Sequence, residues 1–162
     1  TDIKLNQEIF VAAAKHDGTS VCEMLTNCVI FNNGAHAAFT AREEREDRTI
    51  TLRDGEKMVF GKNRDKGLIL KNGKLQVVKI GENSVTMDDI LTHHSGTLDY
   101  GIHSMLIDMK YPDFPVALGV IRDVADRTYD DSVRDQLIEV TEKSKIHCMD
   151  DLLHSGSTWE VE

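Results

Sequence analysis

The stretch from residue 6 to residue 34 reads NQEIFVAAAKHDGTSVCEMLTNCVIFNNG and predicts a helix followed by a strand. Its alanines have high helix propensity and place the helix at 6–15. Residues 19–25 are short and rich in β-forming side chains, which predicts a buried strand that runs into a loop containing Cys28. A helix followed at once by a strand is the order found in parallel sheets, so the sequence predicts the α/β class.

The later part of the chain continues this order of elements. Apolar residues at helical spacing predict an amphipathic helix at 97–110. Residues 116–121 (VALGVI) predict a strand buried on both faces. Thr128 can cap a helix at 129–143, whose inner stripe includes Leu137 and Val140, and a last short helix is predicted at 149–153.

The middle of the chain departs from the α/β order. Residues 35–46 predict one short acidic helix, and the dipeptides Asp54-Gly55 and Asn72-Gly73 are strong hairpin signals. The extended segments that flank them are 49–53, 57–60, 68–71 and 75–80. We therefore expect a β-hairpin extension that packs beside the sheet or against another subunit.

Size and composition favour one soluble globular domain. The chain has 162 residues, of which 40% are hydrophobic, with a net charge of −9. Its longest apolar run is too short to span a membrane, and no signal peptide is visible. Three cysteines without a C-x-x-C pair fit a reduced compartment, so we expect a cytoplasmic protein.

Basic residues concentrate between Arg53 and Lys79. This segment holds eight lysines and arginines against three acids, so it carries +5 in a chain of net −9. It is either a solvated hairpin surface or a docking face for an anionic partner, with Lys71 and Lys74 as the contacts. Nucleic acid is not expected, because aromatic residues do not interleave with the charges, apart from Phe60, and no binding motif is present.

The three cysteines have different expected roles. Cys22 lies inside the predicted strand and is expected in the core, and Cys148 has no assigned function. Cys28 begins a loop, and from sequence alone a lone cysteine is usually a small buried hydrophobic side chain.

Other polar residues favour structural roles. His93 and His94 are adjacent, a spacing that rarely serves one metal, and we expect His93 to hold a strand-end turn by hydrogen bonding. Arg122 and Asp123 end the strand at 116–121. We expect them to form an ion pair that closes the strand, with a cofactor or subunit contact as the alternative.

Five segments together resemble the β subunits of 2-oxoacid:ferredoxin oxidoreductases. The first is Asn27–Asn32 (NCVIFN), which meets the family pattern Asn-Cys-Val-x-Phe-Asn. The others follow in the family's order: DILTH at 89–93, FPVALGVIRDV at 114–124, RTYDD at 127–131 and SGSTWEV at 155–161. His94 departs from the pattern, because the family has an acid after the histidine.

This resemblance implies a fold, a site and a missing part. The fold would be the C-terminal part of a thiamine-diphosphate-binding parallel-sheet fold, with residues 1–34 as its last helix, strand and cluster loop. Residues 35–162 would complete the same globular unit. Cys28 would be one ligand of a [4Fe–4S] cluster, with Asn32 near the cofactor. The family's Gly-Asp-Gly-Asp motif for diphosphate and Mg²⁺ does not occur here, so we expect a C-terminal half that is inactive alone.

The implied reaction is oxidative decarboxylation of a 2-oxoacid with coenzyme A and ferredoxin, in company with an α subunit. The ending Ser155–Trp159 favours 2-oxoglutarate as the substrate, and no catalytic residue is assigned to this segment. Two alternatives stay open: a non-catalytic assembly module in which Cys28 is merely buried, and a cluster-free thiamine-dependent decarboxylase subunit.

Overall fold

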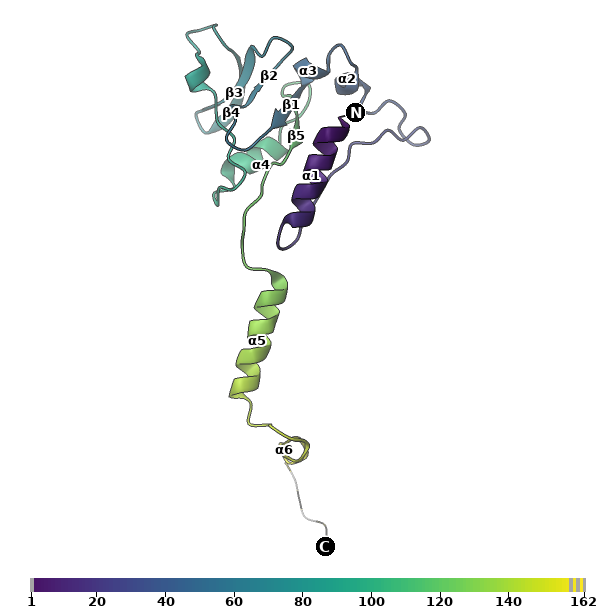
Figure 1. The fold of residues 1–162 in the computed structure, drawn as a ribbon, viewed down its shortest axis with the longest axis vertical. Helices are drawn as coiled ribbons and strands as arrows, with labels where there is room; N and C mark the ends of the chain where they lie inside the picture. The colour runs from purple at the N-terminus through teal and green to yellow at the C-terminus, as the bar shows by residue number, and fades with distance from the viewer. Residues whose placement is uncertain (1, 158, 160, 162) are drawn as a thin grey trace. The chain divides into compact units, whose positions relative to one another are not determined.

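The computed structural model describes residues 2–157, 159 and 161, and the chain divides into two compact units, Thr1–Ala125 and Asp126–Glu162 (Figure 1). The first unit contains a parallel pair of strands, an antiparallel sheet and several helices, and the second contains two helices. The α/β class with a β-hairpin extension is therefore confirmed. The thiamine-binding fold stays a prediction, as does the domain division at residue 34.

The parallel pair consists of β1 (Thr49–Leu52) and β5 (Val116–Gly119). Their register aligns Thr49 with Val116 and Leu52 with Gly119. The sequence located β5 correctly, but the predicted hairpin around Asp54-Gly55 is wrong, because β1 pairs with β5 and not with residues 57–60. In this pairing Ile50 and Leu52 are both buried in the hydrophobic core.

The antiparallel sheet has the order β2 (Val59–Phe60), β3 (Lys66–Lys71) and β4 (Lys74–Lys79). The second hairpin prediction is confirmed, with Asn72 and Gly73 as the two turn residues. Their φ angles are +52° and +72°, and positive φ at both positions is what a type I′ turn requires. The strand β4 forms one edge of this sheet.

One hydrophobic core joins the two sheets to helix α4 (Gly101–Ile107). Ile50 comes from β1, Leu68 from β3 and Leu106 from α4, and all three are almost fully buried. Ile90 is buried next to Gly67, where an added Cβ would lie 2.6 Å from its Cδ1 atom. The core therefore lies in the first unit and combines residues of the parallel pair with residues of the antiparallel sheet.

Helix α1 (Ile3–Lys15) forms as predicted, but the strand expected at 19–25 does not. Asp2 caps the helix by accepting from the Leu5 backbone N–H at 3.0 Å. Residues 19–25 form no ladder with any described residue, and Val21 is 90% exposed. A strand needs a neighbour for its backbone groups, and no described strand lies beside this one. The segment is left extended and uncovered.

Two further predicted helices differ from the structure. The single helix expected at 35–46 is divided into α2 (Ala37–Thr40) and α3 (Arg45–Arg48), and a 3₁₀ turn, η1, covers Met87–Asp89. The helix expected at 97–110 is α4, which begins only at Gly101. The Asp99 carboxylate accepts from the Gly101 N–H at 2.8 Å, and this local turn competes with helix over the preceding residues.

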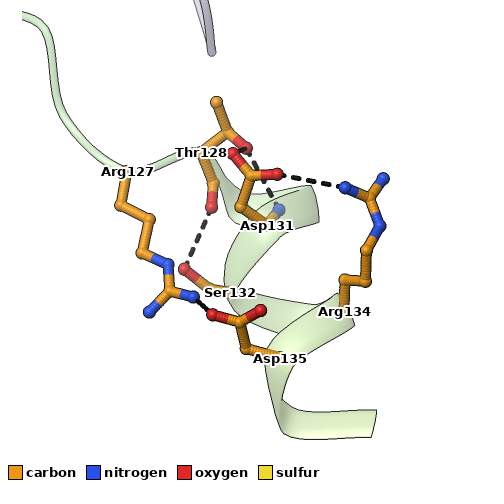
Figure 2. A network of polar contacts seen from close by, with 6 residues as sticks. All are labelled: Arg127, Thr128, Asp131, Ser132, Arg134 and Asp135. Carbon is orange, nitrogen blue, oxygen red and sulfur yellow. Dashed lines mark hydrogen bonds and ion pairs between the residues drawn. The ribbon is translucent and has the colours of Figure 1, made fainter. Parts of the chain in front are cut away.

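The second unit contains α5 (Tyr129–Lys143) and α6 (Met149–Leu153), both where predicted. Figure 2 shows the start of α5, where Thr128 Oγ1 accepts from the Asp131 N–H at 3.1 Å and Arg127 forms an ion pair with Asp135. The predicted inner stripe is not covered within this unit, since Leu137 is 62% exposed. Thr158 and Glu160 of the SGSTWEV segment lie outside the described residues.

The pairing of β1 with β5 depends on a glycine, which gives a first testable expectation. Gly119 has a φ of +108°, and an added Cβ would lie 2.4 Å from the Leu52 carbonyl oxygen. We expect Gly119→Ala to lower the free energy of unfolding by about 3 kcal/mol or more, as measured by urea denaturation. The control is Gly55→Ala, where φ is +75° but no atom lies within 4 Å; its expected cost is about 1–2 kcal/mol. Equal losses in the two variants would contradict the steric role of Gly119.

Candidate functional site

The loop from Asn27 to Gly34 is closed on itself by hydrogen bonds. The Asn32 N–H donates to the Cys28 carbonyl at 3.0 Å, so Cys28 and Asn32 form an isolated antiparallel bridge. Asn27 closes the base, since its Oδ1 accepts from the Gly34 N–H at 2.8 Å and its Nδ2 donates to Asn33 Oδ1 at 3.1 Å. Cys28 therefore stands at the start of a short turn whose ends are tied together by one asparagine side chain.

The electrostatics of this turn favour a thiolate. The backbone N–H groups of Phe31 and Ile30 face the thiol and lower the pKa of Cys28, and that of Asn32 adds a smaller effect. Burial acts weakly in the opposite direction, because Cys28 is exposed. An exposed cysteine surrounded by N–H donors is the environment in which thiolates bind metals or react. Within this chain Cys28 is exposed, and the choice between a metal ligand and a side chain buried by other polypeptide stays a prediction.

Three exposed apolar residues follow Cys28 in the sequence. Val29, Ile30 and Phe31 are 72%, 82% and 91% exposed. Contiguous exposed apolar residues usually mark an interface with other polypeptide. Asn32 contributes its backbone to the bridge with Cys28, and its predicted position near a cofactor stays a prediction.

The other two cysteines are also free and exposed. Cys22 is exposed, so its expected place in the core is wrong, for the same reason that the strand at 19–25 does not form. Cys148 caps α6, where its Sγ accepts from the Asp151 N–H at 3.5 Å. Among residues 2–157, 159 and 161, no three His, Cys, Asp or Glu side chains come together as a metal site.

A second polar cluster lies where β1 and β5 end. His93 is buried, and its Nε2 lies 2.8 Å from the Val120 carbonyl, while its backbone N–H donates to Glu56. The prediction that His93 holds a strand-end turn is confirmed. The Nδ1 atom of His93 is buried without a hydrogen-bond partner among the described residues, so the ring donates through Nε2 only.

Arg122 ties the loop after His93 to helix α4. Its Nη1 lies 2.9 Å from the Nδ1 of buried His103, and it also donates to the Thr97 carbonyl at 2.9 Å. Because a guanidinium can only donate, His103 accepts at Nδ1 and donates from Nε2 to the His94 carbonyl at 3.0 Å. The expected ion pair between Arg122 and Asp123 is wrong, since Arg122 uses carbonyls and an imidazole instead.

Asp123 and Asp54 complete this cluster through contacts that sequence reasoning missed. Asp123 Oδ1 lies 2.8 Å from His16 Nδ1 at the end of α1, and the Asp123 N–H donates to the Ser95 carbonyl. Asp54 accepts from the Ser95 N–H at 2.7 Å and from its hydroxyl at 3.0 Å, and these bonds lower the pKa of Asp54. The signal was present in the Asp54-Gly55 dipeptide, but it was interpreted as a hairpin turn.

The tip of the β3–β4 hairpin carries the two lysines proposed as docking residues. Lys71 and Lys74 lie directly opposite each other across the strands, on either side of the Asn72-Gly73 turn. Both are exposed, and within the described chain neither is in an ion pair. Like charges placed directly opposite in a sheet are destabilising, so this pair opposes the folding of its own hairpin.

The thiolate character of Cys28 is testable by alkylation. In a Cys22→Ser, Cys148→Ser variant only Cys28 reacts, and the serine introduced in place of Cys148 retains a hydroxyl able to cap α6. We expect the rate of iodoacetamide modification to reach half its maximum at a lower pH in the folded chain than in the same variant unfolded in urea, because the loop N–H groups lower the pKa of Cys28. Equal midpoints in the folded and unfolded chain would show that the loop does not stabilise the thiolate.

The opposed lysines allow a test of stability. In Lys74→Glu an acid faces Lys71, so repulsion becomes attraction, and we expect the urea midpoint to rise by roughly 0.1–0.5 M. Lys145→Glu makes the same change of charge in the second unit, away from any strand, and serves as the control. A midpoint lowered by Lys74→Glu alone would show that Lys74 stabilises the hairpin.

Comparison with known proteins shows similarity to an oxidoreductase subunit. No family model matches the chain, and no solved structure matches it. The 2-oxoglutarate oxidoreductase subunit KorB of Mycobacterium tuberculosis is 33% identical over 159 residues, which cover 96% of this chain and 42% of that protein. The chain thus spans less than half the length of this relative. The resemblance predicted from the sequence is confirmed: over nearly its whole length, this chain is similar to a 2-oxoglutarate oxidoreductase subunit.

Proposed function

We propose that this chain is part of the β subunit of a 2-oxoacid oxidoreductase that acts on 2-oxoglutarate. The observation that carries the proposal is the similarity to KorB over 96% of the chain. The exposed Cys28 in a loop of N–H donors supports it, because a cluster ligand must be accessible and deprotonated. Since the chain covers 42% of that relative, the activity would belong to an assembly larger than these residues.

The Cys28 loop fits one ligand of a [4Fe–4S] cluster. Thiolate ligation of such clusters is tuned by hydrogen bonds to sulfur, and the N–H groups of Phe31 and Ile30 are placed to supply them. A four-thiolate cluster needs one more cysteine than the three in this sequence, so at least one ligand would come from other polypeptide. When bound, the cluster supplies one-electron transfer toward ferredoxin.

The chain's own residues would then hold this sulfur in place. Asn27 closes the base of the loop through the Gly34 N–H, which fixes where the Cys28 side chain emerges. The exposed Val29, Ile30 and Phe31 would pack against the rest of the β subunit or the α subunit and exclude water from the cluster. Asn32 would lie at the edge of the cofactor region, where its backbone already bridges to Cys28.

Thiamine diphosphate and Mg²⁺ would be bound mainly by polypeptide other than this chain. The Gly-Asp-Gly-Asp motif for these groups does not occur in the sequence, and carboxylates with phosphate oxygens are the ligands that Mg²⁺ prefers. The 2-oxoacid and coenzyme A would likewise bind to the assembled enzyme. The contribution of this chain is therefore to the path of the electrons and to contacts between subunits.

Measurement of iron tests the proposal and separates it from its alternatives. The chain is co-expressed anaerobically with the remaining part of its β subunit and with the α subunit, as wild type, Cys28→Ser and Cys22→Ser. We expect iron and acid-labile sulfide to fall by at least about half in Cys28→Ser, because a four-thiolate cluster loses one ligand. Cys22→Ser should retain the wild-type content.

The outcomes discriminate between three classes of protein. Equal iron in Cys28→Ser and wild type would remove Cys28 from the ligand set. A complex without iron that still consumes 2-oxoglutarate in a thiamine-dependent way would identify the cluster-free decarboxylase subunit. A complex with neither iron nor turnover would identify an assembly module.

A further inference from the structure

The hairpin β3–β4 has two pairs of opposed lysines, of which only one is neutralised. At its open end Lys66 faces Lys79, and at its turn Lys71 faces Lys74. The first pair is balanced by acids, since Lys66 Nζ lies 2.9 Å from Asp47 Oδ1 and Lys79 Nζ lies 2.7 Å from Glu82 Oε1. The second pair has no such partner within the described chain, so the positive charge at the tip is uncompensated.

Two further basic residues of the Arg53–Lys79 segment are engaged, whereas Lys62 and Arg64 are in no ion pair within the described chain. Arg53 pairs with Glu8 at 3.0 Å, and Lys57 donates to the carbonyls of Asp88 and Ile90. Arg53 and Lys57 therefore bind other parts of the same chain. Lys71 and Lys74 differ because they repel each other across a tight turn and gain no internal contact for it.

The surface next to this pair is suited to a protein partner. Strand β4 is an edge strand, with backbone groups on its outer side free of strand pairing in the described chain. A hollow of about 300 Å³ opens beside Lys71 and is lined in part by Ile69, Leu70 and Val85. Asp89 also lines it, but its Oδ2 accepts from the Thr86 N–H at 2.7 Å and from the Thr86 hydroxyl at 2.8 Å, so this charge is partly satisfied.

We propose that the tip of the β3–β4 hairpin, centred on Lys71 and Lys74, is the docking surface for an acidic electron-acceptor protein. Uncompensated charge next to a half-exposed apolar residue, Leu70, is the combination that steers an oppositely charged protein and then holds it. The segment carries +5 in a chain of net −9, so an acidic partner would be attracted to this part of the chain and repelled elsewhere.

Nucleic acid fits this surface less well. Binding to single strands needs exposed aromatic side chains on which bases stack, and Phe60, the aromatic residue of the segment, is buried. An electron carrier is chosen over other acidic proteins because of the iron–sulfur role proposed above, on which this part of the inference rests. The surface itself is argued only from charge, register and exposure.

Binding of an oxidised acidic [2Fe–2S] ferredoxin to the full chain tests the surface without requiring turnover. The variants are Lys71→Glu, Lys74→Glu and, as a matched change of charge in the second unit, Lys145→Glu. We expect each hairpin variant to weaken binding about tenfold at low salt, Lys145→Glu to change it less than twofold, and salt to abolish the difference. Equal weakening by Lys145→Glu, or no weakening in the hairpin variants, would overturn the proposal.

A second readout in the complete enzyme separates this inference from the proposed function. The ratio of ferredoxin-linked to methyl viologen-linked oxidation of 2-oxoglutarate is measured for the same variants. The ratio should fall about tenfold at subsaturating ferredoxin for Lys71→Glu and Lys74→Glu, and stay at the wild-type value for Lys145→Glu. An unchanged ratio in all three overturns the docking surface alone. If the wild-type enzyme does not oxidise 2-oxoglutarate with methyl viologen, the proposed function is overturned. The binding measurement alone then decides whether the hairpin tip is a docking surface.

Discussion

The parallel pairing of β1 with β5 is the constraint on which the first unit depends. Two parallel strands cannot be joined by a tight turn, so the chain between Leu52 and Val116 must cross over and return. The hairpin β3–β4, the turn held by His93 and helix α4 are all built within this crossover. The pairing also aligns the ends of both strands, which brings Asp54 near Ser95 and Asp123.

This arrangement leaves the unit with surfaces that need further polypeptide. A parallel sheet is normally buried on both faces, and two strands are few for independent stability. Residues 19–25 lie extended without a pairing partner among the described residues, and the apolar residues of the Cys28 loop are uncovered. Coverage of 42% of KorB fits this picture, because the relative has ample additional length to supply neighbouring strands.

Features determined by neighbouring residues were predicted correctly from the sequence. Features that depend on residues far apart in the chain were not. The Asn72-Gly73 turn and the Thr128 cap of α5 were found because the residues that determine them lie within a few positions of each other. The partner of β1 was missed because Asp54-Gly55 is equally compatible with a hairpin and with a strand-end turn. Of the candidate site, the Cys28 loop could be located from sequence, whereas the contact of His16 with Asp123 joins residues far apart in the chain and leaves no local pattern.

The two candidate surfaces share one physical feature, which is that each is costly to the isolated chain. After Cys28 three apolar side chains are exposed, and at the hairpin tip two lysines repel each other. Neither arrangement contributes to the core, which lies among Ile50, Leu68 and Leu106. Interactions that oppose stability are usually retained where another molecule removes their cost. Other polypeptide would cover the apolar loop, and an acidic protein would neutralise the lysines, so the electron-transfer role proposed above would account for both features.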